Sequence, residues 1–304
     1  MSQPFRLNKE GLINRNKKIS FTFNGKKLFG YEGDTIASAL IANGIHLVGR
    51  SFKYHRPRGF FGAGVEEPNA KLQVEFNGHS EPNVNATEME LVEGLSATSQ
   101  NCWPSVNFDI GAINNFLKMF FPAGFYYKTF MWPKSFWYKI YEPFIRKAAG
   151  LGVASIEKDK ERYEHKFEYC DLLVTGSGPS GLASAYAAAK NGAKVILAED
   201  KPRFGGTLLT DDVSIDNLSG KDWAEKIITE LKSMPNVTVK NRSQVFGYYD
   251  HNMLVMFERV SDHLEKKSKF TPRQRLWYIR AKETILSTGS IERPIVFGNN
   301  DTPG

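Results

Sequence analysis

The chain has 304 residues, of which 41% are hydrophobic and 24% are charged, and its formal net charge is +7. These values fit a soluble globular protein with room for two domains. Its two cysteines, Cys102 and Cys170, exclude a disulfide scaffold and a multi-cysteine metal site. No apolar run is long enough to span a membrane and no secretory signal is visible, so we expect a cytoplasmic protein with no membrane partner.

Residues 1–100 are predicted to form a ferredoxin-like β-grasp domain. Alternating apolar residues in 18–31 indicate a hairpin, and its turn falls at Asn24-Gly25, a strong type I′ signal. Asp34 can then cap a helix, and a glycine-rich loop follows that helix. A hairpin, a helix and a glycine-rich loop in this order are typical of the β-grasp.

The glycine-rich loop of this domain, residues 49–64, reads GRSFKYHRPRGFFGAG. Plant-type ferredoxins place cluster cysteines in the corresponding loop. This loop has no cysteine, so we expect no iron–sulfur cluster in the chain. Alternating basic and aromatic residues also occur on nucleic-acid-binding surfaces, but no RNP-like or helix-turn-helix pattern accompanies them here. We therefore expect no nucleic-acid partner, and we interpret these side chains as groups that pack and form ion pairs.

Residues 101–168 are predicted to form a wrapping segment followed by a charged linker. The first part is rich in aromatic residues and is interrupted by prolines, with no clear period. Such a segment can pack between domains or against a partner protein, and a membrane-surface patch is the weaker alternative. Residues 155–169 are highly charged and indicate a solvated helix or linker.

Residues 169–304 are predicted to form a Rossmann-like dinucleotide-binding domain, which we expect to be incomplete. An apolar strand leads into Gly176, Gly178 and Gly181, and a small-residue helix follows. The first glycine allows a tight turn, the second lets the backbone approach a pyrophosphate, and the third lets the helix pack on the strand. Glu199 ends the next strand, where a carboxylate can bind the adenosine ribose and disfavours a 2′-phosphate. NAD or FAD is therefore expected rather than NADP.

Further elements place more residues at this site. The sequences RFGGTLLT, SQVFGYYD and ETILSTGS resemble segments that touch the dinucleotide in two-dinucleotide-binding flavoproteins. Two alternatives stay open, since Thr207 can be a helix cap and Val245 an ordinary strand residue. The residues expected to bind the cofactor are Gly176, Ser177, Gly178, Pro179, Ser180, Gly181, Glu199, Asp200, Lys201, Gly206, Thr207, Val245, Phe246, Thr288 and Gly289.

Longer motifs carry a family resemblance. GDTIASALIANGIHLVGRSFKYHRPRG, EEPNA, SQNCWPS, AGFYYKTFMWP, YEPFIRKAAGLG and STGSIERPIVFGNNDTPG occur in this order. Together with the glycine fingerprint they resemble the alpha subunit of heterotetrameric sarcosine oxidase over nearly the whole chain. The resemblance implies NAD at the fingerprint, with FAD less expected there. It also implies FAD and the amine site in a beta subunit, FMN between alpha and beta, and gamma and delta partners.

The reaction implied by this resemblance oxidises sarcosine to glycine with oxygen. It gives hydrogen peroxide and, with tetrahydrofolate, 5,10-methylenetetrahydrofolate. NAD would then have a structural or regulatory role, so we expect no catalytic residue and no metal ligand in this chain. Family chains continue beyond DTPG with a folate-binding domain, so we expect a fragment that is inactive alone.

Two other functions stay open. A subunit of a related amine or opine dehydrogenase, or of a hydrogen-cyanide-synthase-like enzyme, would share this layout. A non-catalytic scaffold or interaction subunit is the alternative from another class.

Overall fold

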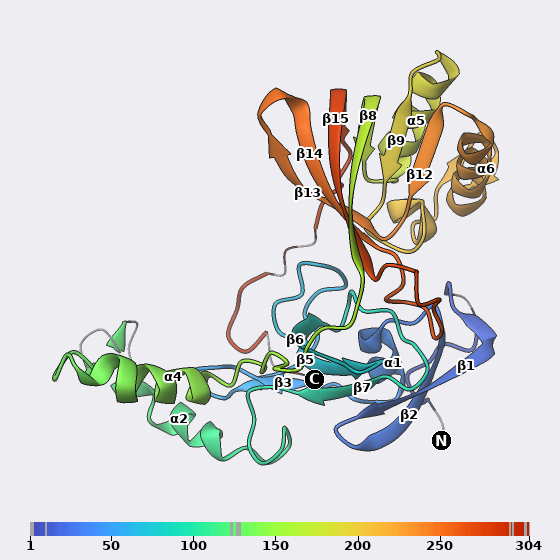
Figure 1. Cartoon of the computed structure of the whole chain (residues 1–304). Helices are drawn as coiled ribbons and strands as arrows, with labels where there is room; N and C mark the ends of the chain where they lie inside the picture. Colours follow the sequence, from blue (N-terminus) through green and yellow to red (C-terminus); the bar gives the residue numbers. More distant parts are fainter. Residues whose placement is uncertain are drawn as a thin grey trace. The chain divides into compact units, whose positions relative to one another are not determined.

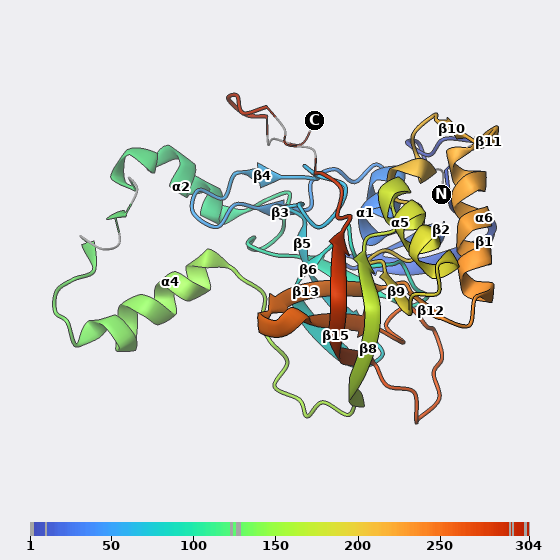
Figure 2. The ribbon, with the colours of Figure 1, turned by 90° about the horizontal axis from the view of Figure 1, so that it is seen from above.

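The computed structural model describes residues 3–9, 11–121, 124–125, 129–291, 293, 295–300 and 303. The chain divides into two compact units, which we call the first unit (Met1–Asp159 with Glu292–Gly304) and the second unit (Lys160–Ile291) (Figures 1 and 2). We had expected boundaries after residues 100 and 168. The compact units instead place residues 101–159 with the β-grasp.

The first unit is built on a five-stranded sheet in the order β2-β1-β7-β5-β6. Strands β1 and β7 are parallel, and the other neighbouring pairs are antiparallel. A helix, α1, and a short hairpin of β3 and β4 complete the β-grasp. The bounds are β1 Asn14–Phe23, β2 Lys26–Glu32, α1 Ile36–Ala42, β3 Gly49–Arg50, β4 Pro57–Arg58, β5 Lys71–Phe76, β6 His79–Asn85 and β7 Ser96–Ser99.

The predicted hairpin and helix are present, with one difference at the helix start. Alternate β1 side chains such as Phe21 are buried, and the turn at Asn24-Gly25 has positive φ at both residues. Thr35, not Asp34, is the N-cap of α1, and it forms a capping box with Ser38. Asp34 is instead paired with Arg6 at 2.7 Å, a contact that no local pattern reveals.

Residues 103–121, 124–125 and 129–151 form a segment of short turns, which we call the aromatic arm. It contains η1 Ile110–Ala112, α2 Ile113–Phe116, η2 Lys118–Phe120, η3 Trp137–Tyr141 and α4 Glu142–Ala149. None of these elements buries a side chain. In both ribbon views α4 lies outside the β-grasp sheet of the same unit. Nowhere in the described residues is there a helix long and apolar enough to cross a bilayer.

The second unit contains a six-stranded sheet in the order β12-β9-β8-β15-β14-β13. Its first four strands are parallel, and β13 and β14 form an antiparallel extension. In chain order the parallel strands follow the pattern 3-2-1-4, which is that of Rossmann-type dinucleotide-binding folds. The bounds are β8 Tyr163–Thr175, α5 Pro179–Lys190, β9 Val195–Ala198, η4 Gly206–Leu209, β10 Ser214–Ile215, β11 Leu218–Ser219, α6 Gly220–Ser233, β12 Val237–Lys240, β13 Ser243–Tyr249, η5 Asp250–Asn252, β14 Met253–Arg259 and β15 Gln274–Leu286.

Both faces of this sheet are covered. Helices α5 and α6 bury Leu182 and Leu231 against β8 and β9 on one face. On the other face, β14 contributes Leu254 and Met256 to a second cluster with Ile196. The prediction that residues 155–169 form a solvated helix or linker is partly wrong. Strand β8 already begins at Tyr163 and pairs there with β15.

Candidate dinucleotide-binding site

The loop between β8 and α5 is shaped by two glycines that no other residue can replace without a clash. Gly176 has a φ of +95°, and a Cβ there would lie 2.2 Å from the main-chain oxygen of Ser287. A Cβ on Gly181 would lie 2.0 Å from the oxygen of Gly176. A Cβ on Gly178 would meet nothing within 4 Å. The loop is thus closed on the protein side and open at Gly178.

Helix α5 presents unused main-chain donors at this opening. Its N-cap is Gly178, which provides no side-chain acceptor, and no acidic residue lies in its first turn. Pro179 begins the helix, a position where the missing N–H costs nothing. The N–H groups around Ser180 and the positive end of the helix dipole therefore suit an anion such as a pyrophosphate.

Glu199 follows β9 and holds the glycine loop from within. Its side chain is 5% exposed. One carboxylate oxygen accepts hydrogen bonds from the Ser177 N–H at 2.9 Å and from the Ser177 hydroxyl, and the other accepts from the Lys201 N–H at 3.1 Å. Burial, and then a hydrogen bond with Asp200, raises the pKa of the Glu199 carboxyl. We had expected this carboxylate to accept hydrogen bonds from a ribose; in the structure it braces the glycine loop through Ser177, and Asp200 lies beside it.

A second glycine pair approaches the same loop. The Gly205 N–H donates to the Ser177 carbonyl and hydroxyl oxygens, each at 3.1 Å. Gly206 has a φ of +54°, and a Cβ there would lie 2.9 Å from the Cα of Gly178. Thr207 lies within η4 and does not cap it, since its main-chain oxygen accepts from Thr210. The structure therefore brings Gly206 close to Gly178, and Thr207 follows it in η4.

The remaining predicted residues lie at two edges of the site. The main-chain nitrogen of Thr288 is 3.5 Å from the position that a Cβ on Gly176 would take, and Gly289 follows with a φ of +68°. Strand β13 begins beside the acidic end of β9, because the Ser243 N–H donates to the Glu199 carbonyl at 2.7 Å. Two residues further on, Val245 packs against the second-face core, and Phe246 is 56% exposed.

Sequence reasoning missed two residues that shape this site. Ser287 supplies the oxygen against which Gly176 packs, and its position directly before the expected Thr288 was an available signal. Arg259 donates to the Asp200 carbonyl at 2.8 Å. Nothing in the local sequence pairs Arg259 with Asp200, because Arg259 ends β14 and Asp200 follows β9.

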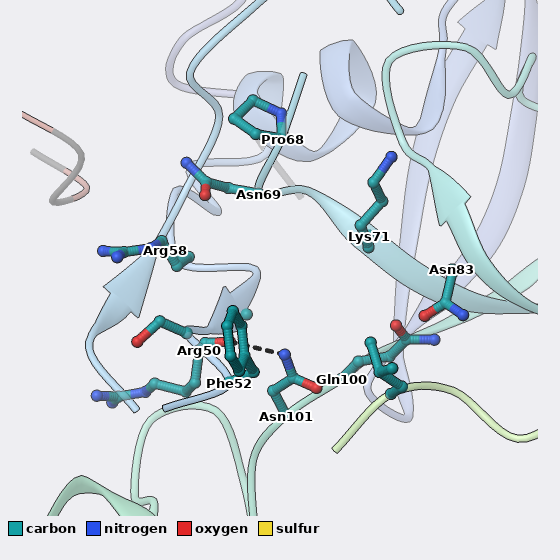
Figure 3. Close-up of a pocket in the computed structure, with 12 residues that line it drawn as sticks. Arg50, Phe52, Arg58, Pro68, Asn69, Lys71, Asn83, Gln100 and Asn101 are labelled. Carbon is teal, nitrogen blue, oxygen red and sulfur yellow. Dashed lines mark hydrogen bonds between the residues drawn. The ribbon is translucent and has the colours of Figure 1, made fainter. Parts of the chain in front are cut away.

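The first unit contains a pocket of about 420 Å³ beside the loop of residues 49–64 (Figure 3). Arg50, Phe52 and Lys71 are among the residues that line it. The Arg50 guanidinium donates to the Val106 carbonyl at 2.7 and 2.9 Å, and Asn101 donates to the Arg50 carbonyl at 3.1 Å. We had expected the loop's arginines to pack and form ion pairs, but Arg50 holds main chain together by donating to carbonyls. We assign no ligand to this pocket.

The same loop continues into a cradle of main-chain amides that is filled by Glu67. This side chain is 1% exposed. One of its oxygens accepts from the N–H groups of Phe61 and Gly62, both at 2.6 Å. The other accepts from Asn69 at 2.6 Å and from Ala70 at 3.1 Å. A buried carboxylate thus satisfies four amides of the loop.

Comparisons with known proteins match each part of the chain. The family model for a 2Fe-2S iron-sulfur cluster binding domain matches residues 16–102, and the one for an FAD dependent oxidoreductase matches residues 171–255. The solved structure of L-proline dehydrogenase from P. horikoshii is similar with a TM-score of 0.60 and 20% identity, over 99% of this chain and 46% of that one. This likeness confirms the predicted fold, a β-grasp followed by a domain of the two-dinucleotide-binding flavoprotein type.

Two relatives differ in how far they match. The alpha subunit of sarcosine oxidase from Rhizobium meliloti (strain 1021) is 54% identical over 300 residues, which are 99% of this chain and 30% of that protein. An opine oxidase subunit from Agrobacterium tumefaciens (strain Ach5) is 27% identical over 142 residues, 45% of this chain and 27% of that one. The chain therefore spans about 30% of the length of the sarcosine oxidase relative.

The match over residues 16–102 overturns our prediction that the chain has no iron–sulfur cluster, and we withdraw it. We had argued from the chain's two cysteines and from a loop that has none, whereas the likeness extends over residues 16–102. Within the described residues, no group of three His, Cys, Asp or Glu side chains could hold a metal, and the loop amides bind Glu67. These residues do not fit a four-cysteine cluster, so we assign no ligands and derive no step through iron.

Proposed function

Because this chain is a homologue of the alpha subunit of sarcosine oxidase along nearly its whole length, we propose that it is the NAD-binding part of such a subunit. At the coarser level it is a member of the flavoprotein oxidoreductases, as the second unit's family match indicates. The identity to the sarcosine oxidase relative is twice that to the opine oxidase relative and extends over more than twice the length. This difference favours sarcosine as the substrate of the assembly over an opine.

The observation that carries the proposal is the opening at Gly178. It combines space for a ligand, an uncapped helix end and the close approach of Gly206. The pyrophosphate would lie over Gly178 and the first turn of α5. The ribose would bond to Asp200 and to the remaining acceptor positions of Glu199. The adenine would lie toward Val245 and Phe246, at the start of β13.

The identity of the dinucleotide rests on the resemblance to sarcosine oxidase alpha subunits, because NAD and FAD share the ADP part that this loop would hold. A carboxylate at the end of β9 repels a 2′-phosphate, which disfavours NADP. When bound, the dinucleotide would serve as a structural or regulatory group. The residues of this chain bind and orient it, and none of them is assigned a catalytic role.

In the assembly that we propose, the chain works with beta, gamma and delta subunits. Sarcosine is oxidised by oxygen to glycine on a different polypeptide, with release of hydrogen peroxide. With tetrahydrofolate the one-carbon unit becomes 5,10-methylenetetrahydrofolate. FAD would lie in the beta subunit, FMN would lie between alpha and beta, and this chain alone would be inactive.

Nucleotide release tests the cofactor. The purified assembly is denatured and the released nucleotides are separated by chromatography, and the chain of 304 residues is titrated in parallel with NAD, NADP and FAD. We expect NAD in the released pool and binding of NAD at least tenfold tighter than that of NADP. FAD bound by the isolated chain, with no binding of NAD, would show that the dinucleotide is wrongly identified. Oxidation of an opine without oxidation of sarcosine would refute the substrate.

A further inference from the structure

The aromatic arm exposes a large total area of aromatic side chains. Its side chains include Phe116, Trp132 and Tyr138, which are 84%, 83% and 83% exposed. Trp103, Phe108, Phe120, Phe136 and Phe144 are also exposed. At the usual size of aromatic side chains this amounts to on the order of 1,000 Å². The largest apolar patch of a typical monomer covers roughly 300–600 Å².

The arm nevertheless has a defined shape, held by contacts of its own. Phe121 packs edge-on against Phe125 with ring centroids 4.9 Å apart, and Phe130 packs against Tyr141 at 5.2 Å. The Tyr54 hydroxyl, in the loop of residues 49–64, donates to the Phe121 carbonyl at 2.9 Å. The exposed rings therefore belong to a formed surface.

The described residues of the arm also carry more cations than acids. The cations are Lys118, Lys134, Lys139, Arg146 and Lys147, and the acids are Asp109 and Glu142. Asp109 pairs with His55 at 2.7 Å and Glu142 with Arg146 at 3.1 Å. Ile140 and Phe144 are exposed one helical turn apart, and Lys147 continues the same face. A complementary surface would be apolar at its centre and acidic at its rim.

We propose that the aromatic arm docks into an apolar groove, rimmed by Asp and Glu, on a different polypeptide of the assembly. This inference rests on the proposed function, in which the chain is one subunit of a hetero-oligomer. A second copy of the arm carries the same excess of cations and would be repelled. A lipid surface suits one continuous amphipathic helix better than the short, separate turns of residues 110–120.

Site-specific photocrosslinking tests the occupant. A benzophenone amino acid replaces Phe116 or Tyr138 in cells that produce the whole assembly, and Lys26, which is exposed in the β-grasp hairpin, is the control position. We expect both arm positions, but not the control, to give an adduct with a different chain in amounts matching the assembly's stoichiometry. The crosslinked peptide should contain Asp or Glu beside apolar residues. An adduct with another copy of this chain, an adduct with lipid, or no adduct would overturn the proposal.

A charge reversal separates this proposal from the nucleotide site. Lys139→Glu with Lys147→Glu should lower the adduct yield at Tyr138 at least tenfold. Lys221→Glu with Lys226→Glu, on exposed positions of α6, is the matched control and should leave the yield unchanged. Released NAD is measured on the same samples. If the control pair loses the adduct but still releases NAD, the docking surface is refuted and the cofactor is not. If the adduct is retained but no NAD is released, the proposed cofactor is refuted and the docking surface is not.

Discussion

The loop of residues 61–70 in the first unit and the loop of residues 176–181 in the second both use glycine to gather main-chain amides. In the first loop the N–H groups of Phe61 and Gly62 donate to the Glu67 carboxylate, which is part of the same chain. In the second loop the space beside Gly178 is open and α5 has no side-chain cap. One cradle is filled from within, whereas the other is open to a ligand.

This difference shows what a glycine-rich loop predicts and what it does not. Glycine indicates that the backbone must come close to something. The partner is decided by the acidic residues that follow. Glu67 lies within its loop and fills it, whereas Glu199 arrives from the next strand and bonds to Ser177 at the rear of its loop. Four substitutions test this difference between the two loops.

The largest effect is expected for Gly181→Ala. The added methyl would lie 2.0 Å from the Gly176 oxygen, so the helix and the strand must move apart. We expect a loss of about 3 kcal/mol in the free energy of unfolding of the second unit. Binding of NAD should fall at least 100-fold. Chemical denaturation and titration calorimetry measure these quantities, and wild-type values for both would contradict the close packing of helix on strand.

Glu67→Gln should destabilise the first unit by about 2 kcal/mol, since one amide N–H₂ would then face main-chain N–H groups. Glu66→Gln is the matched control, because Glu66 accepts from Ala63 and Gly64 nearer the surface. Hydrogen exchange of residues 61–70 should accelerate much more in the first variant than in the control. Equal exchange rates in the two variants would mean that the buried carboxylate does not hold the loop.

Gly178→Ala separates binding from folding. Its Cβ would meet nothing within 4 Å in the protein, so unfolding should change by less than about 1 kcal/mol. The methyl would instead occupy the space assigned to the pyrophosphate, and we expect a roughly tenfold weaker affinity for NAD, about 1.4 kcal/mol. Unchanged affinity with unchanged stability would place the pyrophosphate elsewhere.

The smallest effect is expected on how the free energy of unfolding changes with pH, to which Glu199 contributes. Its pKa is raised in the folded state above its ordinary value of 4.5, chiefly by burial, so the folded protein holds the proton more tightly than the unfolded chain. The stabilisation by Glu199 is present below the pKa that its carboxyl has in the unfolded chain. It is lost as the pH rises through the pKa of the same carboxyl in the folded protein. The slope is at most about 1.4 kcal/mol per pH unit. Glu199→Gln should remove it from denaturation curves taken across that window, and an unaltered slope would assign it to another group.

Local sequence patterns predicted the helices, strands and turns better than the contacts between residues that are distant in the sequence. The turn at Asn24-Gly25 and the strand–glycine–helix unit at Gly176 follow from neighbouring residues, and both are present. Asp34 was expected as a cap, but it pairs with Arg6, which lies 28 residues earlier. The start of β8 at Tyr163 was missed because its charged residues become a strand only when β15 pairs with them.

The candidate site shows the same contrast between local features, which could be predicted, and distant contacts, which could not. The glycines and Glu199 could be placed from their spacing, because each acts through the backbone next to it. The hydrogen bond that Ser177 donates to Glu199 and the one that Arg259 donates to Asp200 depend on how the strands assemble. The iron–sulfur prediction rested on the cysteine count and on one loop, and the family match over residues 16–102 overturned it.

The packing of Ser287 on Gly176 also sets an order of events during synthesis. The glycine loop is made early in the second unit, but the oxygen that closes it belongs to the residue after β15, the last strand of that sheet. A nascent chain that has completed β8, α5 and β9 still lacks this oxygen. The glycine loop is therefore closed only when β15 has left the ribosome, after the whole β-grasp sheet has already emerged.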